Sequence, residues 1–158
     1  MASKEDLKRC REGDKDLFYA DLAAANLRSA DLRGAQLTGA NLVSANLRGA
    51  DLSGAELSGA NLKQADLRDA WFDGARLVGA NMSKADLSGA IFINADLRDS
   101  NLSGAIVARN YLPDRAGIDP NATFINPYLV PEIEVISVDF TDAKLDGATM
   151  PDGKKFKS

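Results

Sequence analysis

The chain has 158 residues, of which 45% are hydrophobic and 27% charged, and its formal net charge is −4. The apolar residues are mainly Ala and Leu, which predicts a narrow, regular core. Acidic and basic residues are interspersed, which argues against a nucleic-acid groove. With no histidine and a single cysteine, the sequence excludes an internal disulfide and a Cys/His dyad.

The first predicted element is a short capping helix over residues 3–14. Ser3 is followed by Asp6 three residues later, and Leu7 and Cys10 are spaced to share one helical face. Such a helix would cover apolar side chains and strand edges at the start of the following segment. The charged N-terminus does not resemble a secretory leader and no stretch is as long as a membrane span, so we expect a cytoplasmic protein.

A five-residue repeat, Ala-Asp/Asn-Leu-x-Gly, runs without a gap over residues 20–104. A straight helix would carry the central Leu around every face, and a straight strand would place successive Leu on opposite faces. The chain must therefore turn at every repeat. If each corner turns by about 90°, four repeats close a square coil of about twenty residues, with Leu and the Ala two before it inside and coils about 4.8 Å apart. We predict continuous coils over 15–112.

The fifth position of the repeat supplies the corner, where a type II turn needs a positive φ. Glycine is the usual residue there, as at Gly54. Asp69 and Asn94 are tolerable substitutes. Gln64 and Lys84 are predicted to favour other turn forms.

These repeats resemble the pentapeptide-repeat family. The resemblance implies an all-β fold, a right-handed quadrilateral β-helix whose central residue and preceding Ala point inward. The handedness is taken from the family. The closing run Ala-Thr-Met-Pro-Asp-Gly over 148–153 is similar to the ends of cyanobacterial members, which suggests a source of that kind.

Beyond the coils, the repeat is interrupted and then resumes. Four prolines fall in an irregular stretch that we interpret as an excursion over 113–137. The Ala-x-centre spacing returns at Ala143 and Ala148, so resumed repeats are predicted over 138–152. The whole chain, 1–158, is then one solenoid domain.

When residues twenty apart are stacked, two columns each repeat one polar residue, and they are called the asparagine column and the arginine column. We expect the asparagine column to brace the stack through its amides. The arginine column is expected to be compensated by nearby aspartates, and an anion-binding stripe is the alternative. The asparagines are Asn41, Asn61, Asn81 and Asn101, the arginines are Arg28, Arg48 and Arg68, and the aspartates are Asp31, Asp51 and Asp69.

One column is apolar where the others are polar. Trp71, Ile91 and Tyr111 occupy the outward position before the centre, and Ile93 lies beside them. These four residues are the candidate partner-binding patch, because an exposed apolar patch on a soluble protein generally has a partner.

Beneath this patch, Phe72 and Phe92 replace leucine as centres, and we predict that their rings stack. Three occupants of the patch are open: the excursion over 127–137 folded back, another protein, or a second copy of this chain in a homodimer.

The sequence offers no catalytic, cofactor-binding or metal-binding residues, so we expect no enzyme and no cofactor. The favoured function is a non-enzymatic protein-interaction or scaffold protein, without nucleic acid or membrane as partner. The resemblance implies an alternative, a DNA-mimicking modulator of DNA gyrase. Ten acidic and eight basic residues over 21–104 imitate a phosphate backbone poorly. A stable protein without any partner is the third hypothesis.

Overall fold

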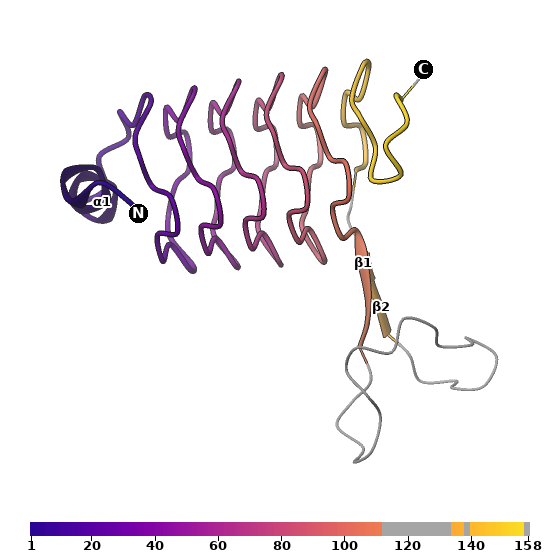
Figure 1. The fold of residues 1–158 in the computed structure, drawn as a ribbon, viewed down its shortest axis with the longest axis horizontal. Helices are drawn as coiled ribbons and strands as arrows, with labels where there is room; N and C mark the ends of the chain where they lie inside the picture. Colours follow the sequence, from indigo (N-terminus) through magenta and orange to yellow (C-terminus); the bar gives the residue numbers. More distant parts are fainter. Residues whose placement is uncertain (112–133, 138–139, 157–158) are drawn as a thin grey trace, which may run out of the picture.

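The computed structural model describes residues 1–111, 134–137 and 140–156, with the backbone alone at 108–111 and 134–137. These residues form a rod of stacked coils (Figure 1). Helix α1 (Lys4–Arg11) covers the N-terminal end, and strands β1 (Ala108–Tyr111) and β2 (Glu134–Ser137) leave the rod together near the other end. The chain then returns to form the last coil (Figure 1).

Each coil consists of four repeats, and residues twenty apart lie side by side in parallel. The pairs run from Asp16 with Gln36 to Asp86 with Ile106. The Ala and Leu of the repeat point inward, and Ala50 is as fully buried as the leucine centres around it. The stack is held by backbone hydrogen bonds of about 2.7–3.1 Å between successive coils.

The corner residue of every repeat from Tyr19 to Gly104 has a positive φ. Gln64 and Lys84 both have φ 59°, so the prediction that they favour other turn forms is wrong. The stack explains this result, because the N–H of Gln64 donates to Ser83 O and that of Lys84 to Ser103 O, both at 3.0 Å, as the other corners do. Neighbouring coils thus impose the turn on residues that adopt it at a cost of about 1 kcal/mol.

The polar position before each centre completes the hydrogen bonding of the turn. In the repeat 50–54, four of the five N–H groups donate to backbone carbonyl oxygens. The fifth, that of Ser53, donates to Oδ1 of Asp51 at 3.0 Å. The same bond recurs with asparagine, for example from Lys63 N–H to Asn61 Oδ1 at 3.2 Å. Asp and Asn therefore supply the acceptor that the backbone of the coil lacks.

Helix α1 is capped at both ends by its own sequence. Ser3 Oγ accepts from the N–H of Asp6 at 3.3 Å. At the other end Gly13, with φ 85°, turns the chain, and its N–H donates to Cys10 O at 3.2 Å, which is typical of a Schellman motif. This turn makes the helix shorter than the predicted 3–14. Asp6 Oδ2 accepts from the N–H of Asp21 at 3.0 Å, so the helix pairs part of the free edge of the first coil.

The coils resume in phase after the excursion. Asp96 pairs with Lys144 and Asn101 with Thr149, 48 residues apart instead of twenty, so the excursion adds 28 residues to one coil. Phe140 thereby takes the centre position that the spacing assigns to Leu112.

The predicted end of the continuous coils at 112 is wrong, because the chain leaves the stack with β1 at Ala108. Asn110 lies two residues before Leu112, where the repeat needs a small apolar side chain pointing inward. A polar amide there would have no partner in the core, which favours departure. β1 pairs antiparallel with β2, Tyr111 opposite Glu134. Most of the predicted excursion and residues 138–139 lie outside the described residues.

We expect Leu52→Asp to unfold the rod. Leu52 is fully buried in the core, and an unpaired carboxylate there would cost at least several kcal/mol. Far-ultraviolet circular dichroism and urea titration measure the effect. A variant that keeps the wild-type spectrum and midpoint would contradict the stacked-coil interior.

We expect Asn61→Ala to lower the free energy of unfolding by about 1 kcal/mol, because the N–H of Lys63 loses its acceptor. Asn61→Asp is the matched control, since it keeps an oxygen at the same place. Urea titration of both variants distinguishes them. Equal midpoints would show that this polar position serves solvation alone.

Candidate functional site

Trp71, Ile91 and Ile93 form an apolar patch on one wall of the rod. Trp71 and Ile91 are paired in parallel between neighbouring coils, so their side chains follow one another along the wall. Trp71 is 54% exposed. Ile91 and Ile93 are half-buried. These three residues are called the apolar patch below.

Aromatic rings support the apolar patch from inside. Phe72 and Phe92 are fully buried, with ring centroids 4.6 Å apart and planes within 2° of parallel, which confirms the predicted stacking. Phe140 continues the stack, 5.4 Å from Phe92. Planar rings packed between fixed backbone layers give the patch a rigid base.

The apolar patch comes at a cost to the fold. Tryptophan and isoleucine carry no hydrogen-bond acceptor, so the N–H groups of Asp73 and Ile93 lack the side-chain partner that Asp51 gives to Ser53 on the same wall. Each such bond is worth about 1 kcal/mol elsewhere. Residues that weaken their own turns and leave an apolar ring half-exposed point to a role outside the fold.

A carboxylate lies next to the apolar patch. Asp73 is exposed, and within the described part of the chain it has no ion pair. Asp51, the next residue along the Trp71 column, is within 3.8 Å of Arg33. The patch therefore combines an exposed aromatic ring with an uncompensated negative charge.

Tyr111, the fourth predicted member of the patch, is not in the column. It belongs to β1, which leaves the rod, and its side chain lies outside the described residues. The segment 127–133 lies outside them as well, so the prediction that the excursion covers the patch stays a prediction.

Among the described residues, and apart from the terminal Met1, three further exposed large apolar side chains were not predicted. Ile106 is 41% exposed and occupies the outward position before Val107, so the rule that found Trp71 would also have found it. Phe18 is 49% and Tyr19 76% exposed, and both lie in a turn, where the sequence gives no signal. The Tyr19 ring packs over Gly39, where a Cβ would lie 2.5 Å from it, so the glycine there makes room for the ring.

The polar columns are organised differently from the prediction. In the asparagine column the oxygens serve the turns, and the described residues show one amide bond along the stack, from Asn41 Nδ2 to Asp21 Oδ1 at 3.0 Å. Most of that predicted ladder is therefore replaced by bonds within each repeat.

In the arginine column, Arg48 and Arg68 have carboxylate partners, whereas Arg28 has none among the described residues. Arg48 pairs with Asp69 at 3.3 Å, and Arg68 Nε donates to Asp66 at 2.7 Å. The hydrogen bonds from Arg68 hold the pKa of Asp66 below its usual value. Asp31 and Asp51 were expected to compensate this column, but they face Arg33 instead.

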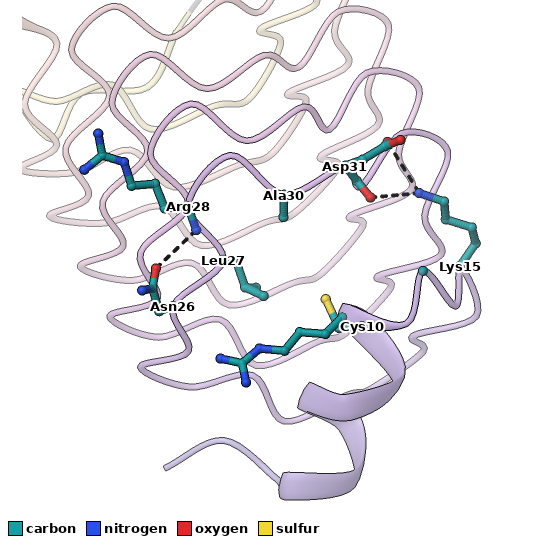
Figure 2. Close-up of a pocket in the computed structure, with 9 residues that line it drawn as sticks. Cys10, Lys15, Asn26, Leu27, Arg28, Ala30 and Asp31 are labelled. Carbon is teal, nitrogen blue, oxygen red and sulfur yellow. Dashed lines mark hydrogen bonds and ion pairs between the residues drawn. The ribbon is translucent and has the colours of Figure 1, made fainter.

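A pocket of about 480 Å³ lies between α1 and the first coil (Figure 2). Its lining includes Cys10, Leu27 and Arg28, and the Cys10 thiol points toward the coil. Cys10 is 7% exposed, and burial raises the pKa of its thiol, while Lys15 and Arg11 oppose the shift. A protonated, covered thiol is a poor nucleophile.

Within residues 1–111, 134–137 and 140–156, no group of three or more His, Cys, Asp or Glu side chains has the arrangement to hold a metal ion. In the same residues, no helix combines the length and apolar character that crossing a bilayer requires.

The family model for pentapeptide repeats matches residues 16–54, 40–77 and 70–107, with eight copies of the repeat. The chain therefore belongs to the pentapeptide-repeat family, and its fold is the right-handed quadrilateral β-helix of that family. No curated protein sequence matches it.

Three solved pentapeptide-repeat structures are similar to this chain. One, from the thylakoid lumen of Arabidopsis thaliana, is 35% identical with a TM-score of 0.58, over 64% of this chain and 69% of that one. Rfr23 of the cyanobacterium Cyanothece 51142 is 27% identical with a TM-score of 0.55, over 78% and 65%. Alr5209 of Nostoc PCC 7120 is 39% identical with a TM-score of 0.50, over 63% and 78%.

We expect the Cys10 thiol to react with iodoacetamide at neutral pH at least about tenfold more slowly in the folded protein than in urea, because it is covered and protonated. Mass spectrometry of timed samples gives both rates. A folded protein that reacts as fast as the unfolded chain would contradict this description of the thiol.

Proposed function

We propose that the chain is a non-enzymatic interaction protein that docks another protein through the apolar patch. The observation that carries the proposal is Trp71 itself, a half-exposed ring held on a buried aromatic stack. Rigid aromatic residues with little entropy to lose are the usual anchors of protein interfaces.

The chemistry of the partner follows from the surroundings of the ring. An apolar side chain would pack on Trp71 and Ile91, and a cation would meet Asp73, whose charge nothing described in the chain compensates. The partner segment is therefore apolar and flanked by Lys or Arg. This charge complementarity favours another protein over a second copy of this wall, whose own Asp73 would repel it.

The alternative, a DNA-mimicking modulator of DNA gyrase, has less support. DNA mimicry needs free carboxylates along the rod, but here many of them accept from turn N–H groups and pair with arginine, as Asp66 and Asp96 do. A cytoplasmic location stays a prediction.

Trp71→Asp should keep the fold while removing the anchor. The ring loses its half-buried contacts, but the new carboxylate restores the missing acceptor for the turn N–H, and the two effects oppose one another. Circular dichroism and thermal melting measure the fold. Loss of the β spectrum would show that Trp71 serves stability instead.

Selection from a library of displayed peptides tests the proposed partner directly. We expect binders to combine apolar residues with Lys or Arg, and to fail on Trp71→Asp/Ile91→Asp. Asn61→Asp, a change on the opposite wall that keeps its turn acceptor, is the matched control. Trp71 is the single tryptophan, so its fluorescence reports binding at the patch. Acidic consensus peptides, or binding that survives the double substitution, would contradict the proposal.

A further inference from the structure

Two arginines stand apart from the others in their lack of a charged partner. Of the arginines whose side chains the structure describes, six lie within 4 Å of a carboxylate oxygen, and Arg11 and Arg28 do not. Both line the same pocket, between α1 and the first coil. Two arginines without a carboxylate partner therefore contribute to the lining of one pocket.

The pocket exists because α1 does not fill the open end of the rod. Eight helical residues span about 12 Å and cover only part of a square coil. Ala30 shows the gap, since it is only partly buried whereas its counterpart one coil later, Ala50, is fully buried.

The uncovered edge of the coil also presents free backbone donors to the pocket. In the next coil, Asn46 N–H donates to Ala25 O at 2.9 Å and Asp51 N–H to Ala30 O at 3.0 Å. The corresponding N–H groups of Asn26 and Asp31 have no preceding coil, and within the described part of the chain no acceptor receives them. Unpaired backbone N–H groups and arginine side chains are the donors that usually form an anion-binding site.

The remaining charges divide the pocket into two sides. Figure 2 shows Arg28 on one rim and the ion pair of Lys15 with Asp31 on the other. Lys15 Nζ lies 3.5 Å from Asp31 Oδ1 and also donates to Asp31 O at 2.9 Å. Asp31 further accepts from Arg33 at 2.7 Å, so its carboxylate is neutralised on its own rim.

On the Arg28 rim, Asn26 adds to the donors. Its Oδ1 accepts from the backbone N–H of Arg28 at 3.3 Å, which leaves the amide Nδ2 available as a donor.

We propose that this pocket binds a phosphate group, held by Arg11, Arg28 and the N–H donors of Asn26. Phosphate carries between one and two negative charges at neutral pH and has enough oxygens for two guanidinium groups and a backbone N–H. The site shares no residue with the apolar patch, which begins at Trp71, two coils further along the rod than Asp31.

Nuclear magnetic resonance titration of the ¹⁵N-labelled protein with inorganic phosphate tests the proposal. We expect saturating shifts that centre on the amides of Asn26 and Arg28. Arg28→Gln and Arg11→Gln should each weaken binding about tenfold or more, whereas Arg98→Gln, which removes an arginine paired with Asp96, should not. Circular dichroism checks that all three variants fold.

Two further titrations define the ligand. Acetate, a single charge, should bind at least about tenfold more weakly than phosphate. Glycerol 3-phosphate binding more tightly than inorganic phosphate would assign the site to phosphate esters, and equal affinity would assign it to the free ion. No saturation up to about 20 mM phosphate, shifts spread over all basic residues, or equal affinities for Arg28→Gln and Arg98→Gln would overturn the proposal.

Discussion

Every backbone N–H of a coil must find an acceptor, and this constraint organises the whole molecule. A chain that turns every five residues can pair four of its five N–H groups with backbone carbonyl oxygens, as the repeat 50–54 does. The fifth depends on a side chain placed two residues earlier, so Asp or Asn stands before most of the centres. The polar periodicity of the sequence is thus a backbone requirement as much as a surface property.

Both proposed binding surfaces lie where this pairing is incomplete. At the apolar patch, Trp71 and Ile91 replace the acceptor with apolar side chains, so the turn is weakened and a hydrophobic surface is gained. At the N-terminal end, the first coil has no coil before it, and α1 pairs Asp21 N–H but leaves that of Asn26 open. The regular stack between these places is rigid and charge-compensated, which suits it to holding sites rather than forming them.

The period of five fixes the fold, because it allows neither a straight helix nor a straight strand, and the inward Ala and Leu follow from it. The Trp71 column was equally predictable, since an apolar residue at a polar position breaks a strict pattern. The pocket was not, because it arises from how far a short helix reaches across a coil end. The early departure at Ala108 was not predictable from the period, which continues to Leu112 and gives no weight to the polar residue Asn110.

Hydrogen exchange of individual amides tests the central claim. The claim is that the polar side chain before each centre accepts a hydrogen bond from the turn N–H, and that this bond is absent at the apolar patch. The N–H of Ser53 is bonded to Asp51, whereas those of Asp73 and Ile93 on the same wall have no such acceptor. After correction for intrinsic rates, the Ser53 amide should exchange at least about fivefold more slowly than the other two, because a bond worth about 1 kcal/mol gives that factor. Equal exchange at the three amides would contradict the account, because the side-chain bond would then contribute nothing to the turn.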